Sequence, residues 1–290
     1  MPPDTVPSRV ALVVHPTRAI DGALATLRRW SDERGVAVAQ LAVQGDGDRS
    51  VAAPSALEPG DLVVALGGDG TVLSALRAAA ADDAPVLGIA CGSLGALSAV
   101  TADHLAAALD RVWAGDWTPR ALPAIAVDGG AEWAANDFVV VRRGAGQLVV
   151  ELSVDDELYA RLAGDGLIVA TPLGSSAYSM AAGGPLLAAG TAGFVCTPLA
   201  MHGGSAPPLV VPADATATVV VKPGFAGFDV EIDGHDRDLA GPRFALTLHP
   251  DKLTLVTFAA SGRGLAGLRK RRLVSDSPRI LARDERAGRD

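Results

Sequence analysis

"LVVALGGDGTVLSALRAA", from Leu62 to Ala79, is the stretch that decides the fold. Leu62–Leu66 is a run of five apolar residues, which is typical of a buried parallel strand. From Thr71 onward the apolar residues recur at the spacing of one helix face, in residues of good helix propensity. The turn Gly67–Gly70 therefore lies at the carboxyl end of a strand, where open α/β sheets bind their ligands.

The composition limits the classes of protein to which the chain can belong. Its 290 residues can bury a full core and favour two domains over one. A formal net charge of −8 and a pI near 5.1 argue against a general attraction to nucleic acid or to acidic membranes. The two cysteines cannot form a disulfide framework, and no apolar run reaches membrane-spanning length. We expect a cytoplasmic globular protein.

Two patterns divide the chain. From Arg9 to about Trp117, short apolar runs alternate with helical stretches, which predicts a parallel, doubly wound α/β sheet. After "GDWTPR", short segments rich in β-branched residues follow, including a hairpin expected to turn at Asp155-Asp156. We expect an α/β domain over residues 1–118, a β-rich domain over residues 119–268 and a charged, solvated tail over residues 269–290.

The glycine turn can bind an anion. Its backbone amides can converge on a phosphate, and glycine leaves room for that phosphate to approach. Asp69 would repel a phosphate unless it held Mg²⁺ through water or accepted the proton of an attacking hydroxyl. Alternatively, the segment is a tight turn in which the helix dipole favours Asp69. The P-loop and dinucleotide-binding signatures are absent from this sequence.

Two later segments carry further polar candidates. In "GDGLIVATPLGSSAYSMAAGGPLL", Pro172 ends a short strand and Gly174 is expected to open a helix. Asp165 can accept hydrogen bonds from a nucleobase amine or a sugar hydroxyl, and Tyr178 can stack on a ring. The alternative is an ordinary strand-to-helix junction with a core tyrosine. Asn136-Asp137 can bind the vicinal hydroxyls of a ribose, or can form a strand-end turn.

Together these segments resemble a known family. "GGDGT" at Gly67–Thr71 is similar to the motif shared by NAD kinases and diacylglycerol or sphingosine kinases, and "TVLSALR" resembles the NAD kinase continuation. Gly164–Leu187 resembles the NAD kinase signature over its whole length. Further similarities are "VALVVHPTR", "GIACGSLGALS", "AANDFVV" and "VEIDG". The resemblance covers roughly Val10 to Gly234, in the family's order.

The resemblance implies an α/β domain followed by a β-sandwich domain, with the site in the cleft between them. It implies transfer of the γ-phosphoryl group of ATP to the adenosine ribose 2′-hydroxyl of NAD, with Mg²⁺ or another divalent cation. Asp69 would be the catalytic carboxylate and would reach the metal through water, if at all. The residues that would bind phosphates are Gly67, Gly68, Gly70 and Thr71, and those that would contact NAD or shape its pocket are Asn136, Asp137, Asp165, Ser176, Ala177, Tyr178 and Asp233. Resemblance alone also implies a homo-oligomer, either a dimer or a tetramer.

The sequence departs from the family pattern mainly on the acceptor side. The departures are Ala90 for a common Asn, Ala96 for Phe, Asp137 for Glu, Ala181 for Ser and Pro207 for Arg. Three hypotheses follow: an NAD kinase, a kinase of the same fold acting on another nucleoside or nucleotide hydroxyl, and a catalytically weak nucleotide sensor. The intact Asp69 argues against the sensor, and the choice between the first two stays open.

Overall fold

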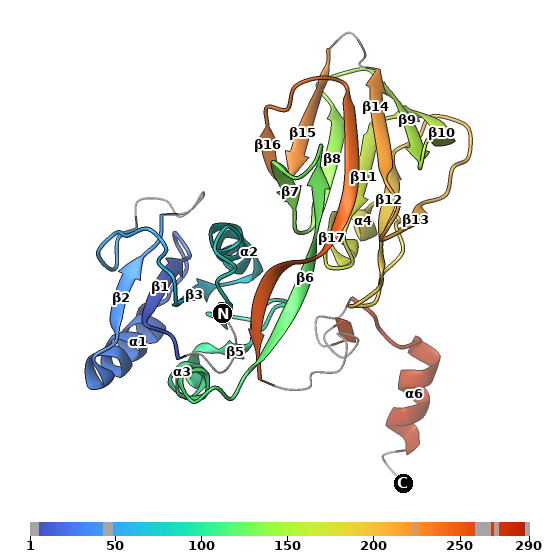
Figure 1. Ribbon diagram of the computed structural model, residues 1–290. Helices are drawn as coiled ribbons and strands as arrows, with labels where there is room; N and C mark the ends of the chain where they lie inside the picture. Colours follow the sequence, from blue (N-terminus) through green and yellow to red (C-terminus); the bar gives the residue numbers. More distant parts are fainter. Residues whose placement is uncertain are drawn as a thin grey trace.

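The computed structural model describes residues 6–42, 49–222, 224, 226–258, 268–269 and 273–287. The deciding stretch folds as its pattern predicts (Figure 1). Strand β3 (Asp61–Gly67) is buried along its whole length, and helix α2 (Asp69–Ala79) begins after a single residue, Gly68. The glycine turn therefore joins a central strand directly to a helix.

The first part of the chain is a doubly wound parallel sheet, as predicted. Its strands run in the order β2 (Ala37–Gln40), β1 (Arg9–Val14), β3 and β4 (Val86–Ala90), and all neighbours are parallel. The buried residues of helices α1 (Asp21–Arg34) and α3 (Leu105–Trp113) form one apolar cluster with this sheet, and those of α2 form another. Helices therefore cover both faces. A short strand, β5 (Val100–Thr101), and a 3₁₀ turn, η1 (Ala102–His104), precede α3.

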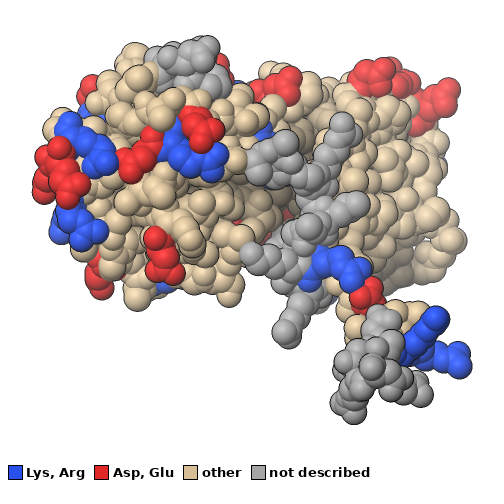
Figure 2. All heavy atoms as spheres, turned by 90° about the horizontal axis from the view of Figure 1, so that it is seen from below, with Lys and Arg blue, Asp and Glu red and all other residues tan. Residues whose placement is uncertain are grey.

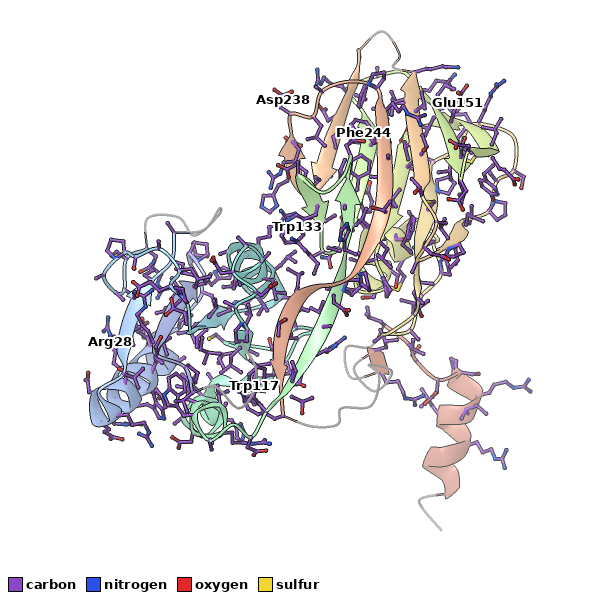
Figure 3. The ribbon with its side chains drawn as sticks, in the orientation of Figure 1. Arg28, Trp117, Trp133, Glu151, Asp238 and Phe244 are labelled. Carbon is purple, nitrogen blue, oxygen red and sulfur yellow. The ribbon has the colours of Figure 1, made fainter. Side chains whose placement is uncertain are left out.

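The second part is a β-sandwich, which confirms the fold class. One layer pairs in the order β13, β12, β11, β8, β15, β16, and the other contains β10, β9, β14, β17, β6 and β7. Phe244 lies between the layers (Figure 3) and packs on Phe138 with ring centroids 5.2 Å apart. The bounds of these strands are β6 (Thr118–Val127), β7 (Glu132–Ala134), β8 (Asp137–Arg142), β9 (Leu148–Val154), β10 (Glu157–Gly164), β11 (Gly166–Ala170), β12 (Gly193–Leu199), β13 (Leu209–Pro212), β14 (Ala217–Lys222), β15 (Phe228–Ile232), β16 (His235–Arg237) and β17 (Arg243–Thr257).

One long strand joins the two parts. Strand β17 spans 15 residues, pairs with β6 along the sandwich and reaches β4 in the α/β sheet, where Leu255 lies opposite Val86. Figure 1 shows β6 and β17 running side by side between the two parts. The pairing of β17 with β6 is irregular between His249 and Leu253. The domain limits at residues 118 and 268 stay predictions, because β6 and β17 belong to both parts.

Two local predictions have different outcomes. The hairpin is confirmed: Asp155 and Asp156 both have positive φ and connect the antiparallel strands β9 and β10. The helix expected from Gly174 is wrong in detail. A 3₁₀ turn, η2 (Gly174–Ser176), is followed by a one-turn helix, α4 (Tyr178–Ala181), because the backbone at Ala177 is not helical.

The C-terminal helix and the surface charges complete the description. Near the C-terminus, helix α6 (Pro278–Ala287) projects away from both domains (Figure 1), within the segment expected to be a charged tail. Figure 2 shows acidic and basic side chains intermixed on the α/β domain, at the left of that view. Within the described ranges, every helix is too short or too polar to cross a membrane.

Candidate active site

The glycine turn is built around close backbone contacts. A Cβ at Gly67 would overlap the Thr71 side chain, which is buried in the first turn of α2. Gly68 is extended and its carbonyl accepts the Val72 N–H at 3.1 Å. The first N–H groups of a helix have no partner within the helix, so those at the start of α2 can bind an anion.

Asp69 is held by the next loop of the sheet. Its two carboxylate oxygens accept the backbone N–H groups of Ala96 at 2.8 Å and Leu97 at 3.0 Å. A Cβ at Gly95 would overlap this carboxylate, so a larger residue there would displace Asp69 from its present position. The loop after β4 therefore fixes the orientation of Asp69, while its side chain stays partly exposed.

Arg18 lies beside the glycine turn, and two further basic residues, His15 and Arg49, contact the loop that carries it. A Cβ at Gly68 would lie 3.0 Å from a terminal nitrogen of Arg18, and a Cβ at Gly92 would lie 3.3 Å from it. Arg49 supports the loop after β1 by donating to the carbonyls of Arg18 at 2.6 Å and His15 at 3.2 Å. Burial, together with Arg18 and Arg49, lowers the pKa of His15. The Nδ1 of His15 accepts a hydrogen bond from the backbone N–H of Arg18 at 3.0 Å.

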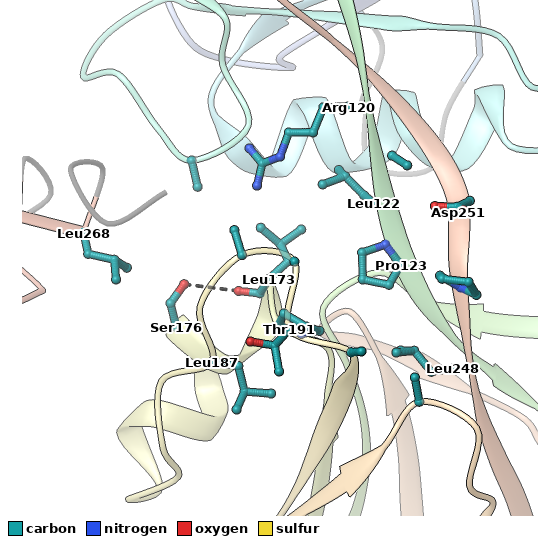
Figure 4. A pocket seen from close by; sticks show the side chains of 18 of the residues that line it. Arg120, Leu122, Pro123, Leu173, Ser176, Leu187, Thr191, Leu248, Asp251 and Leu268 are labelled. Atoms are coloured by element: carbon teal, nitrogen blue, oxygen red, sulfur yellow. Dashed lines mark hydrogen bonds between the residues drawn. The ribbon is translucent and has the colours of Figure 1, made fainter. Parts of the chain in front are cut away.

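A cavity of about 370 Å³ opens between the two domains (Figure 4). Gly95 and Ala96, from the loop that holds Asp69, form part of its wall, and Ser176 lies on the opposite domain. Arg120, at the start of β6, also lines the cavity. None of the residues Gly67–Thr71 lines the cavity, but Asp69 binds Ala96, which shares the cavity wall with Ser176.

Asp233 has a structural partner at every oxygen. Its side chain is fully buried and accepts the N–H groups of Ala135 (3.1 Å), Asn136 (2.7 Å) and Asp137 (3.2 Å). It also pairs with Arg77, in the last turn of α2, at 2.7 Å. We interpret Asp233 as the residue that positions the Asn136-Asp137 segment, rather than one that contacts a substrate.

Asp137 is a buried carboxylate without a hydrogen-bond partner among the described residues. It is 5% exposed at the start of β8. Burial raises its pKa to about 7, with further contributions from Asp233 and Glu231. Asn136, next to it, is half-buried, and its carbonyl accepts the Thr171 N–H at 2.9 Å. This segment and the start of the 171–178 loop are therefore in direct contact.

Asp165 lies apart from these groups. Asp165 precedes β11, whereas Ser176 comes after β11 in the chain. The two residues therefore lie toward opposite ends of this five-residue strand, which is roughly 17 Å long. The carboxylate of Asp165 pairs with Arg142 at 2.6 Å. Tyr178 is 43% exposed, and its pKa is raised by burial and by the charges of Glu231, Asp137 and Asp165. Ala177 is also exposed.

The departures from the family pattern are spread over the molecule. Ala96 lines the cavity, and its N–H binds Asp69. Ala90 is buried at the end of β4, whereas Ala181 and Pro207 are exposed and lie outside the cavity wall. Among the described residues, no group of three or more His, Cys, Asp or Glu side chains is placed to hold a metal ion.

Comparisons with known proteins agree with this architecture. The ATP-NAD kinase N-terminal domain matches residues 26–117, and the ATP-NAD kinase C-terminal domain matches residues 135–242. The NAD kinase of Nitratidesulfovibrio vulgaris strain Hildenborough is 35% identical over 271 residues, which is 88% of this chain and 89% of that protein. The chain belongs to the NAD kinase family.

Other relatives match over different lengths of the chain. The NAD kinase of Heliobacterium modesticaldum is 38% identical over 182 residues, 60% of this chain, and the alignment spans only 64% of the relative's length. An NAD kinase from Archaeoglobus fulgidus, solved in complex with ATP, has a TM-score of 0.72 at 23% identity, covering 92% of this chain and all of that one. Yeast NADH kinase, solved with NADH, has a TM-score of 0.71 at 19% identity, covering 92% and 87%. These two structures confirm the NAD kinase fold.

Three arginines of this NAD kinase family member were missed by sequence reasoning. Arg18 follows β1 in the quoted "VALVVHPTR", so the rule that ligands bind at the carboxyl ends of parallel strands could have found it. Arg49 supports it from an irregular segment. Arg120 is the last residue of "GDWTPR", where the pattern changes, and no signal in the sequence distinguishes it.

Proposed function

We propose that this chain is an ATP-dependent NAD kinase, which transfers the γ-phosphoryl group of ATP to the adenosine ribose 2′-hydroxyl of NAD and forms NADP. The observation that carries the proposal is the Asp69 carboxylate. It is fixed by the N–H groups of Ala96 and Leu97, beside a cavity large enough for part of a nucleotide. Phosphoryl transfer depends on such positioning and on charge neutralisation more than on covalent chemistry by the protein.

The donor phosphates bind at the glycine turn in this proposal. Gly68, Gly70 and Thr71 present backbone N–H groups at the start of α2, where the helix dipole favours an anion. Gly67, the last residue of β3, leaves room for the phosphates because it has no side chain. Arg18 lies against Gly68 and makes no hydrogen bond through its guanidinium within the described part of the chain. A cation at this position can neutralise part of the charge of a triphosphate.

A divalent cation fits this arrangement if the phosphates of ATP coordinate it and Asp69 binds one of its water ligands. Each Asp69 oxygen accepts one N–H bond and keeps a second lone pair, which suits hydrogen bonding to a metal-bound water. The described residues offer no cluster of metal ligands, so the phosphates of ATP would supply most of the coordination. When bound, Mg²⁺ neutralises the charge on the phosphates. Asp69 would also accept a hydrogen bond from the attacking 2′-hydroxyl and take its proton.

The acceptor binds on the sandwich side of the cavity in this proposal. Asn136 and Asp137 offer an amide and a carboxylate for ribose hydroxyls, held in place by Asp233. Ser176 forms part of the cavity wall, and Ala177 and Tyr178 follow it. We keep Asp165 as a predicted NAD contact, although it lies at the other end of β11.

The test is Asp69→Asn, assayed with ATP, Mg²⁺ and NAD and followed by mass spectrometry of NADP. Asparagine keeps the size of the side chain and loses the charge, so we expect kcat to fall by roughly 10²–10⁴-fold. Asp82→Asn, which removes an exposed carboxylate beyond α2, is the matched control. Near-full activity of Asp69→Asn would mean that Asp69 is only a turn residue.

A second candidate function is phosphorylation of a different nucleoside or nucleotide hydroxyl. The observation that favours it is Ala96 in the cavity wall, because its side chain fills less of the cavity than the usual Phe would. The same assay with NADH and a panel of nucleosides in place of NAD separates the two. A nucleoside with a higher kcat/KM than NAD would establish the second function.

Two further expectations belong to this proposal. We expect a cytoplasmic homo-oligomer, either a dimer or a tetramer. Light scattering on the purified full chain measures the mass, and a monomer at assay concentration would contradict the expectation.

A further inference from the structure

Among the residues that the structure describes, Arg120 is a charged side chain without a counter-ion. It is half-buried at the start of β6, and its guanidinium lines the cavity between the domains (Figure 4). Within the part of the chain that the structure describes, it makes no ion pair, hydrogen bond or ring contact. Asp251 lines the same cavity, but Figure 4 shows it on the far side of Leu122 and Pro123.

Other half-buried arginines of the chain differ in this respect. Arg9 makes a two-nitrogen contact with Asp61, at 3.0 and 2.7 Å. Arg77 pairs with Asp233 at 2.7 Å. Burial lowers the pKa of Arg120, and no carboxylate of the described residues counters this shift. Removing a charge from water without a partner is costly, so this position is more stable when an anion enters the cavity.

The surroundings of Arg120 suit one class of anion. The cavity wall is mostly apolar and includes Leu122, Leu173 and Leu187, and Ser176 and Thr191 add hydroxyl groups. Such a mixture is typical of sites that bind an organic ligand and orient it through few polar groups. A guanidinium presents N–H donors in a fork that matches two phosphate oxygens.

We propose that Arg120 binds the diphosphate group of the dinucleotide acceptor in this cavity. The inference rests on the proposed function and adds a binding residue to it. Arg120 shares the cavity with Ser176, on the proposed acceptor side. Arg18, by contrast, lies against Gly68 and Gly92 and is available for the phosphates of the donor. One arginine thus serves each substrate, on either side of the loop that holds Asp69.

The test compares binding of NAD, ATP and adenosine to the full chain by isothermal titration calorimetry. For Arg120→Met, which keeps the length and loses the charge, we expect NAD to bind at least tenfold more weakly. ATP and adenosine should bind within twofold of the wild-type affinity. Arg120→Lys should restore part of the NAD affinity. The control is Arg161→Met, which removes an exposed arginine on β10, far from the cavity wall.

Each outcome decides the inference. Unchanged NAD affinity in Arg120→Met, an equal loss of adenosine affinity, or a loss confined to ATP would overturn it. Should Arg120→Met fail to fold, Arg120→Lys carries the test, because a lysine point charge without the guanidinium fork should still weaken NAD severalfold. A wild type that forms no NADP, but whose NAD binding depends on Arg120, would remove the proposed function and keep this inference. No NAD binding by the wild type would overturn both.

Discussion

Replacing Asp137 with asparagine is expected to stabilise the protein at alkaline pH and to flatten its pH dependence. Asp137 is 5% exposed, and no described residue donates a hydrogen bond to its carboxylate. Burial, then Asp233 and Glu231, raises its pKa from an ordinary value near 3.8 to about 7. The folded protein therefore binds this proton more tightly than the unfolded chain does.

The magnitude follows from linkage. Between the two pKa values the folded state holds more protons than the unfolded state, so stability falls as pH rises. The stabilisation is fully present below pH 3.8 and is lost as pH rises through 7. At about 1.4 kcal/mol for each pH unit, the loss attributable to Asp137 between pH 5 and pH 8 is roughly 3 kcal/mol. Asparagine has no proton to lose, so Asp137→Asn lacks this contribution.

The assay is urea unfolding at pH 5 and pH 8, followed by far-ultraviolet circular dichroism. The quantity of interest is the change in unfolding free energy between the two pH values, wild type minus variant. Asp82→Asn, which removes an exposed carboxylate, should behave as wild type. Equal pH dependence in Asp137→Asn and wild type would refute the assignment of a raised pKa to Asp137. A variant less stable than wild type at pH 8 would refute the account of its burial.

Three further outcomes are expected. Gly95→Ala should lower kcat at least tenfold, because the new Cβ would displace the Asp69 carboxylate; unchanged steady-state kinetics would contradict that contact. Arg77→Met should lower the unfolding free energy, measured by urea titration, by up to about 3 kcal/mol. This is the lower limit of the usual cost of breaking a buried ion pair, because three backbone N–H groups still bind Asp233. Asp165→Ala should raise KM for NAD and leave KM for ATP nearly unchanged; a parallel rise would argue against separate donor and acceptor sides.

Local patterns predicted the parts of the fold that depend on neighbours in the chain. The apolar run Leu62–Leu66 and the helical spacing after Thr71 gave β3 and α2 almost to the residue, because one is a buried strand and the other packs a single face. The hairpin at Asp155-Asp156 was equally predictable, since aspartate tolerates the positive φ that the turn requires. The candidate residues at Gly67–Thr71 were found from the same pattern, because they lie in the turn between this strand and this helix.

Contacts between distant segments were beyond sequence reasoning. The irregularity between His249 and Leu253 interrupts the period-two pattern, so the sequence alone does not show that one strand, β17, continues from the sandwich to the α/β sheet. Asp233 was expected to contact NAD because only its residue type and motif were visible. Its actual partners, three backbone N–H groups and Arg77, lie about 100 and 156 residues away. Arg120 was missed because only the fold shows that no described carboxylate lies beside it.

Helix α2 explains how the two sides of the site keep their relative positions. It begins at Asp69, beside the glycine turn, and Arg77 in its last turn pairs with the buried Asp233. Arg77 also lies 4.7 Å from the ring centroid of Trp133, which Figure 3 shows on the side of the sandwich that faces the α/β domain. The eight-residue step between Asp69 and Arg77 is about 12 Å of helix, a span that a helix holds rigidly. Because Asp233 fixes the backbone of Asn136 and Asp137, a shift of either domain would have to break a buried ion pair before it could separate the phosphate side from the acceptor side.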